Sequence, residues 1–476
     1  IKMERALPSS IDYTKILPIA AGNPRAMRRT YLPVNGQQFT SQGNNIVRIE
    51  ISASQFLDPL HSYLRFDVTV PNVAGTTVGL DYGGGHGFIR RLRLEQAGSI
   101  IMDCNRYDKL LAAILLPCQG GLESLAHRSI TEQSRYNNTG TIANPNQPSQ
   151  AAVTNGAQLC ALQNSDAQIN LNTTFQCCIP LVGGLFSQSK LIPLQLLSSA
   201  PLTIEIELSP PQDPFISATV IPTNLGVADY TWSNVRYIAS LVDVSPEVDA
   251  QIRMVQEMSG GHIVLNTTDY THFNGNISAN ATGSQAINVP ARRKSMKSIL
   301  FTGASQTFGA DGTAAGTTQF RRYNQSFGGH FNMVDYHAKI GQLQYPATPV
   351  LVNANVTNGN FSRGDALMEL SKCFGTTGSV VGTGILSRAN YATTDCDVVG
   401  MATTNTVARF SPFGLDLEAF QRTAIESGVN TADRSTPITL VVNIGAPNAE
   451  AINVDCFVSY DALYYIDSSG IISVSQ

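Results

Sequence analysis

The chain has 476 residues, more than the ~250–300 that one hydrophobic core usually serves, so two domains are expected. Its 43% of hydrophobic residues excludes a wholly disordered chain, and its net charge of −4 excludes a body that binds nucleic acid over its whole surface. Charged residues make up only 14%, against about 25% in ordinary globular proteins, which favours a surface that mostly meets copies of itself.

The first 43 residues contain four prolines and little periodicity, which predicts an extended arm over residues 1–43. Within residues 1–29, six basic side chains face two acidic ones, whereas the rest of the chain is acidic. A basic arm on an acidic body is expected to meet lipid headgroups or nucleic acid, although a solvated tail fits the same charges. The basic residues of the arm are Lys2, Arg5, Lys15, Arg25, Arg28 and Arg29.

Residues 44–245 are expected to form a first set of strands, because apolar and polar residues alternate with a period of two. Asp58-Pro59 is expected to break the chain between the first two strands. The strands predicted in this half are residues 47–53, 64–70, 88–95, 99–104, 174–180, 202–208 and 230–244.

Three segments between these strands depart from the period of two. The glycine cluster at 83–87 lacks the spacing of a phosphate-binding loop and precedes a strand, so it predicts a bend. Apolar residues with helical spacing over 107–115 predict an amphipathic helix, capped by Asn105 and ended by Pro117. Residues 118–172 are polar with little strand signal and are expected to form an exposed insertion.

A helix over residues 246–261 is expected to join the two halves of the chain. Ser245-Pro246-Glu247 combines a capping serine, a proline at the first helical position and an acidic residue. Val248, Ile252 and Val255 predict its buried stripe, and Gly260-Gly261 ends it.

Residues 262–476 repeat the plan of the first half. Ser362 is expected to cap a helix over 363–374, and polar insertions are expected at 306–330 and 375–407. The strands predicted here are residues 262–270, 286–289, 296–302, 333–344, 438–444, 452–460 and 466–474. This density of strands, with few helices, indicates an all-β chain of two sandwiches and not alternating βαβ units.

No motif in the sequence points to catalysis, a cofactor or a metal. The seven histidines never occur as HxH or HExxH, and the eight cysteines form neither a CxxC pair nor a disulfide framework. A GxSxG elbow is also absent from the sequence. Short basic clusters at 90–93 and 292–294 are typical of solvated strand edges. We therefore expect a protein that is not an enzyme and has no catalytic, cofactor-binding or metal-binding residues.

Several short stretches resemble a known family. In the first half they are FLDP at 56–59, SYLRF at 62–66, IRRLRL at 89–94, IMD at 101–103 and LIPLQLL at 191–197. In the second half they are INVP at 287–290, KSILF at 297–301 and GVNTADR at 428–434. Together they resemble the double jelly-roll major capsid proteins of icosahedral DNA viruses, in the branch of virophages, polinton-like viruses and nucleocytoplasmic large DNA viruses. The sequence departs from that family at 291–293, where Ala-Arg-Arg replaces the usual Asn-His-Pro.

The resemblance implies two consecutive eight-stranded jelly-roll sandwiches, over 44–245 and 262–476, with a few short helices and long loop insertions. It implies a homotrimer with a pseudo-hexagonal outline, and such trimers, or capsomers, tile an icosahedral shell. The implied partners are neighbouring capsomers, minor capsid or cement proteins and penton proteins, with the basic arm facing an internal membrane or the genome. The implied location is the capsid of the virion, after assembly inside the host cell.

Two other functions remain open on the residues alone. A tandem β-sandwich that binds carbohydrate or cleaves glycosides would need clustered aromatic and acidic residues, yet the only tryptophan, Trp232, falls inside a predicted strand. Another viral surface component, such as a penton or spike protein, fits the same composition but would assemble with a different symmetry. The major capsid protein is the function that the sequence favours.

Overall fold

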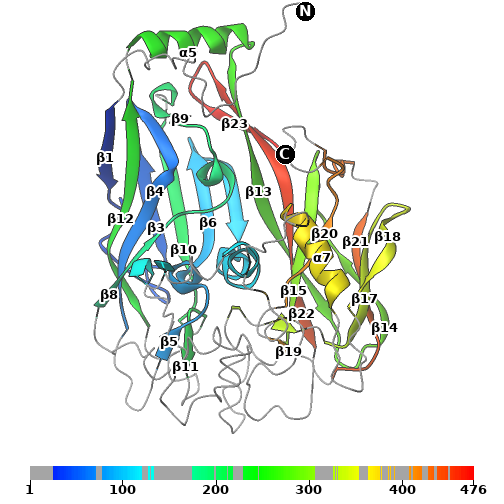
Figure 1. The fold of residues 1–476 in the computed structure, drawn as a ribbon. Coiled ribbons are helices and arrows are strands. Elements are labelled where there is room, and N and C mark those ends of the chain that lie inside the picture. Colours follow the sequence, from blue (N-terminus) through cyan, green and yellow to red (C-terminus); the bar gives the residue numbers. More distant parts are fainter. Residues whose placement is uncertain are drawn as a thin grey trace, which may run out of the picture.

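In the computed structural model the chain forms two β-sandwiches that stand side by side (Figure 1). We call the sandwich formed by the strands before residue 245 roll one, and the sandwich formed by those after residue 261 roll two. The structure describes residues 25–70, 78–120, 127–128, 130–132, 174–197, 200–211, 213–217, 229–244, 246–305, 325–326, 328–329, 331–352, 363–375, 377, 384, 386, 391, 407–408, 411–420, 427–433, 437–448 and 451–476. Most of the predicted insertions at 118–172, 306–330 and 375–407 therefore lie outside the described residues.

Roll one is built from twelve described strands. They are β1 (Arg25–Tyr31), β2 (Gln38–Thr40), β3 (Ile46–Ile51), β4 (Phe56–Thr69), β5 (Val78–Leu80), β6 (Ile89–Gln96), β7 (Ser99–Asn105), β8 (Thr174–Ile179), β9 (Ile192–Pro193), β10 (Leu202–Leu208), β11 (Phe215–Ser217) and β12 (Thr231–Asp243). One main sheet has the order β1-β12-β4-β8, with β2 and β9 attached, and the other has the order β3-β10-β6-β7. Strands β5 and β11 form a separate two-stranded sheet.

The core of roll one comes from the inward face of both main sheets. Exposed and buried residues alternate strictly along β3, as its period-two sequence predicts. The rings of Phe66 on β4 and Trp232 on β12 stack with their centroids 3.8 Å apart, and both side chains are fully buried. Phe88 meets both rings edge-on at the middle of the core.

Roll two repeats this plan with eleven described strands. They are β13 (His262–Ile277), β14 (Gly283–Asn288), β15 (Met296–Ser305), β16 (Gly328–Gly329), β17 (Met333–Ile340), β18 (Leu343–Leu351), β19 (Val407–Ala408), β20 (Phe413–Asp416), β21 (Ile438–Ile444), β22 (Ile452–Asp467) and β23 (Ile472–Ser475). One sheet has the order β13-β22-β15-β16-β19, with β20 on β15 and β23 on β22, and the other has the order β14-β21-β17-β18. The rings of Phe301, Tyr336 and Phe413 pack together in the core between these sheets.

The described helices are short. They are the 3-10 turns η1 (Gly84–Phe88), η6 (Gly184–Ser187) and η7 (Leu194–Leu196), the consecutive turns α1 (Tyr107–Lys109), η2 (Leu110–Leu115) and α2 (Leu116–Gln119), and the helices α5 (Pro246–Met258) and α7 (Gly364–Cys373). Pro117 lies in the first turn of α2 and does not end the helical segment, which continues to Gln119. No helix in the described part of the chain is long and apolar enough to cross a membrane.

Helix α5 lies across one end of the molecule and leads from β12 into β13, within the segment 246–261 where a helix between the halves was predicted (Figure 1). Its buried stripe differs from the prediction. Val255 is 56% exposed, whereas Gln256 is 6% exposed and donates a hydrogen bond to the Ile466 carbonyl at 3.3 Å. The helix therefore packs on the end of roll two through a polar contact that hydrophobic spacing does not reveal.

Regular structure begins earlier than the sequence predicts. Residues 25–43 were expected to belong to the arm, but β1 and β2 both pair with β12. Strand β12 has 13 residues and accommodates both partners along one edge, β1 opposite Tyr237–Asp243 and β2 opposite Thr231–Ser233. The prediction failed because six consecutive residues of β1 are exposed, so the strand shows no period of two.

Asp58-Pro59 does not break the chain, because β4 continues through it. In the pairing of β4 with β12, Ile238 stands opposite Tyr63 and Ser240 opposite Asp58, so residues 59–62 of β4 bulge against a single residue of β12. The Asp58 carboxylate accepts hydrogen bonds from the Leu60 and His61 amides at 3.2 and 3.3 Å. The bulge thus accommodates the proline, which cannot donate to the ladder.

Three predicted strands of roll two also differ from the structure. The segment 333–344 is a hairpin of β17 and β18 that turns at Gly341, whose φ is 62°. The predicted strands 452–460 and 466–474 have other bounds in the structure. Strand β22 continues to Asp467, and β23 begins after the turn that follows.

Candidate assembly surfaces and the contact between the rolls

Three of the six basic residues predicted for the arm lie on β1, the outer strand of its sheet. Arg25 stands opposite Asp243, three residues before α5 begins, so β1 starts at the end of the molecule that α5 crosses (Figure 1). Arg28 Nη2 donates a hydrogen bond to the Tyr63 hydroxyl at 2.9 Å. Arg29 lies on the same strand, and Lys2, Arg5 and Lys15 lie outside the described residues.

Each of the two outer flanks of the molecule carries some of the exposed apolar side chains of the described surface. Next to β1, Leu32 and Val34 are 62% and 57% exposed, and the adjacent strand β3 adds Ile46. On roll two, Leu343 and Leu351 of β18 are 62% and 56% exposed. Figure 1 shows β1 and β18 on opposite sides of the molecule.

The two rolls are fastened to each other by a buried ion pair. Lys109 of α1 in roll one contacts the Asp455 carboxylate of β22 in roll two, and His272 Nε2 lies 2.8 Å from the other oxygen of Asp455. Burial alone would raise the pKa of Asp455, but the Lys109 charge and the His272 hydrogen bond outweigh it and hold the pKa below its usual range. The carboxylate therefore stays ionised inside the contact.

Gln96, at the end of β6, makes a second contact between the rolls. Its side chain is 1% exposed, its Nε2 donates to the Gly470 carbonyl at 2.8 Å, and its Oε1 accepts from the Ile472 amide at 2.8 Å. One side chain of roll one thus holds the turn between β22 and β23 of roll two by both of its polar atoms.

A third contact lies where a described part of the predicted insertion 306–330 reaches roll one. Ser326 donates to both Asp81 oxygens, from its amide at 3.0 Å and from its hydroxyl at 2.6 Å. Gln325 Nε2 donates to Asp108 Oδ2 at 2.9 Å. Both carboxylates are buried, so these bonds replace the water that the oxygens would otherwise bind. This part of the insertion joins the rolls and is not an exposed loop.

Asp269 on β13 is a fully buried carboxylate without a basic hydrogen-bond partner among the described residues. Burial raises its pKa from 3.8 to about 6, although it accepts hydrogen bonds from the Tyr270 amide and the Tyr460 hydroxyl. Its ionisation at neutral pH therefore opposes folding.

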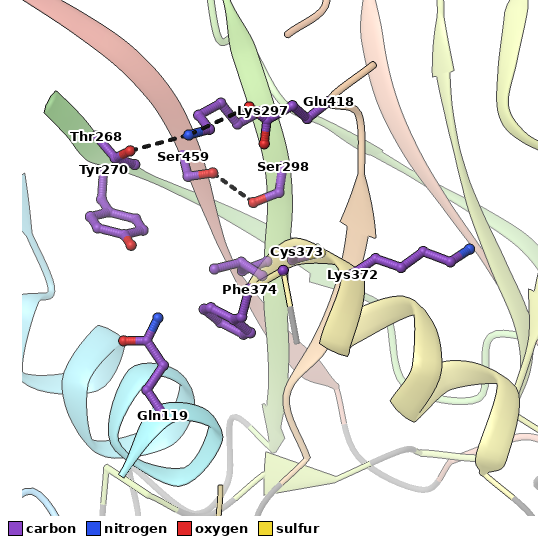
Figure 2. A pocket seen from close by; sticks show the side chains of 12 residues that line it. Gln119, Thr268, Tyr270, Lys297, Ser298, Lys372, Cys373, Phe374, Glu418 and Ser459 are labelled. Carbon is purple, nitrogen blue, oxygen red and sulfur yellow. Dashed lines mark hydrogen bonds and ion pairs between the residues drawn. The ribbon is translucent and has the colours of Figure 1, made fainter. Parts of the chain in front are cut away.

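A pocket of about 250 Å³ opens at the junction of the rolls (Figure 2). Gln119 of α2 forms its roll-one side, whereas strands β13, β15 and β22 and helix α7 of roll two form the rest. Sequence patterns gave no sign of it, because its walls come from segments far apart in the chain.

The described residues include no cluster suited to hold a metal ion and no thiol with a lowered pKa. None of their histidine, cysteine, aspartate and glutamate side chains form a group of three or more that could hold a metal ion. The six described cysteines are free, and burial raises the pKa of thiols such as Cys104 and Cys177 well above its ordinary value. These thiols are correspondingly poor nucleophiles at neutral pH.

We expect Lys109→Met to lower the free energy of unfolding by about 3–5 kcal/mol, because it leaves the buried Asp455 carboxylate without its cation. Denaturant titration at pH 7 measures the change. The double variant Lys109→Met/Asp455→Leu should recover most of the loss, and Lys294→Met, which removes an exposed lysine, serves as the control. An unfolding midpoint for Lys109→Met equal to that of the control would contradict the assigned role of the ion pair.

We expect Asp269→Asn to stabilise the protein at pH 7.5 by up to about 3 kcal/mol, the cost of ionising a carboxyl whose folded pKa is about 6 and whose unfolded pKa is 3.8. The sign follows from the raised pKa, since the native state binds the proton more tightly. Stability from this residue is therefore present below about pH 4 and lost as the pH rises to 6. Thermal unfolding between pH 4 and 8 should show a flatter pH dependence for the variant than for the parent; parallel curves would refute this.

No family model and no curated protein match the sequence. Solved structures match its fold. PBCV-1 VP54, fitted into a reconstruction of the virophage Sputnik, has a TM-score of 0.58 and 9% identity, over 98% of this chain and 99% of that chain. The Faustovirus major capsid protein has a TM-score of 0.52 and 9% identity, over 94% of this chain and 92% of that chain.

The mavirus major capsid protein has a TM-score of 0.51 and 9% identity, over 99% of this chain and 95% of that chain. The likeness spans both sandwiches and nearly the whole length of each protein compared. The predicted fold class is therefore confirmed: the chain is a double jelly roll, the fold of these viral capsid proteins.

Proposed function

We propose that this chain is the major capsid protein of an icosahedral DNA virus and that it assembles as homotrimers. The observation that carries the proposal is a pair of jelly rolls, fastened side by side by buried contacts, that matches viral capsid proteins over nearly the whole chain. Three such pairs bring six rolls together and give the trimer a pseudo-hexagonal outline. Units of that outline tile the shell of the virion.

The flanks of the molecule support assembly into a ring. The roll-one flank, next to β1, and the roll-two flank, along β18, carry exposed apolar side chains on opposite sides of the chain. Each chain can contact the next one through these two different surfaces. If each contact rotates the next chain by one third of a turn, three chains form a closed ring. Roll one of each chain then meets roll two of its neighbour. The low charge content of the chain reduces the cost of removing these flanks from water.

The proposed partners are neighbouring capsomers, minor capsid or cement proteins and penton proteins. Assembly takes place inside the host cell, where thiols stay reduced, and the free cysteines of the described residues agree with such a compartment. The chain acts as a building block and not as an enzyme.

The basic arm is proposed to face inward, toward an internal membrane or the genome. Arg25, Arg28 and Arg29 on β1 place the start of the described chain at the end that α5 crosses. Lys2, Arg5 and Lys15 add three positive charges upstream of that point. An anionic surface facing this end would attract all six residues.

We expect the purified protein to have three times the 51.1 kDa mass of the chain, measured by size-exclusion chromatography with light scattering. Negative-stain images should show hexagonal outlines.

Replacing the exposed leucines of the roll-two flank, in Leu343→Glu/Leu351→Glu, should shift the protein to monomers, because a buried flank cannot hold unpaired charges. Met254→Glu, on the exposed side of α5, is the matched control and should remain trimeric. A stable monomer of the parent would overturn the proposal, and five-fold rings would favour a penton protein.

We expect deletion of residues 1–24, which spares β1, to leave the trimer intact and to reduce the yield of closed particles at least severalfold. Replacing only Lys2, Arg5 and Lys15 with glutamine should reproduce part of that loss, because the arm is proposed to act through its charge. Particle counts by electron microscopy measure both effects. Normal particle yield from the truncated chain would refute a role for the arm, whatever the oligomeric state.

A further inference from the structure

The pocket at the junction of the rolls is lined mostly by roll two, with one residue of roll one at its edge. Gln119 at the end of α2 approaches it from roll one, and the facing walls belong to roll two (Figure 2). Its volume of about 250 Å³ is far above the ~15 Å³ that one water molecule needs on this scale. The pocket can therefore receive a small ligand with a ring.

Each lysine at the pocket is paired with at least one carboxylate. Lys297 Nζ lies 3.7 Å from Glu418 Oε1 and 3.6 Å from Asp461 Oδ1, so its charge is compensated within the wall. Lys372 Nζ lies 2.6 Å from Glu369 Oε2, and Figure 2 shows its amine directed away from the other lining side chains. Both lysines are thus paired with carboxylates, and a phosphate would find no unpaired cation here, which favours a neutral ligand.

The remaining lining groups combine hydroxyls with aromatic rings. Ser298 and Ser459 share a hydrogen bond of 2.6 Å, and each hydroxyl keeps further donor or acceptor capacity. The rings of Tyr270 and Phe374 and the amide of Gln119 lie around the same space in Figure 2. A purely apolar ligand would remove these polar groups from water without replacing their bonds, at a cost in free energy.

We propose that this pocket binds one monosaccharide residue of a glycan. A sugar ring is neutral, offers hydroxyl groups that both donate and accept, and presents C–H faces that pack against aromatic rings. The hydroxyl groups would bond to Ser298, Ser459 and Gln119, while a ring face packs on Phe374 or Tyr270. This binding activity goes beyond the proposed capsid function and does not depend on it.

The test uses the full-length protein and four probes, the methyl glycosides of glucose, galactose, mannose and N-acetylglucosamine. Saturation-transfer NMR should detect binding of at least one probe, with a Kd of roughly millimolar, as expected for a ligand of this size. Gln119→Ala and Phe374→Ala should each weaken that binding about tenfold or more, because each removes one wall of the pocket. The matched controls Gln251→Ala, on the exposed side of α5, and Phe420→Ala, at a residue 62% exposed, should bind as the parent does.

Absence of binding by all four probes in the folded parent protein would overturn the proposal. Binding that Gln119→Ala and Phe374→Ala leave unchanged would also overturn it, since the sugar would then lie elsewhere. The circular dichroism and light-scattering mass of each variant verify that fold and assembly are retained. Because the mass is measured separately, a failure of sugar binding is distinguished from a failure of the capsid proposal.

Discussion

The buried contact between the rolls is the constraint on which the rest of the structure depends. Lys109 and Asp455 bring charge into a buried place, and such groups are tolerated only when their partners, here each other and His272, are in position. A shift of one roll against the other would separate the charges and leave Asp455 uncompensated. The ion pair therefore specifies one arrangement of two sandwiches that are otherwise similar modules, while Gln96 fixes the same arrangement through neutral hydrogen bonds.

This fixed arrangement gives the molecule its two opposite flanks. Because the rolls stand side by side, the edge strand β1 and the hairpin strand β18 lie on opposite sides of the molecule (Figure 1). A single chain thus presents two different flanks, as the proposed head-to-tail ring requires. The pocket lies at the same junction, where Gln119 of roll one meets a wall of roll two. The burial of Asp269 lowers the free energy of unfolding at neutral pH, because it raises the pKa of this carboxyl to about 6.

The alternation of apolar and polar residues predicted most strands, because a strand with one wet face must follow a period of two. It located β3 and β10 almost to the residue. The same rule missed β1, which is exposed on both faces, and wrongly ended a strand at Asp58-Pro59, where a bulge opposite β12 absorbs the proline. In both places a pairing partner more than 150 residues away decides the outcome, and local pattern cannot reveal it.

The sequence by itself determined the all-β class, the duplicated plan and the absence of known catalytic motifs, since each depends on local periodicity or on spacing along the chain. Only the tertiary structure decided which polar residues are buried. Asp455 and Ser459 fall on the predicted wet face of β22, yet they are 8% and 6% exposed because roll one or α7 covers that face. Lys109 and Asp455 are 346 residues apart, and nothing in the neighbourhood of either one distinguishes it from a solvated charge.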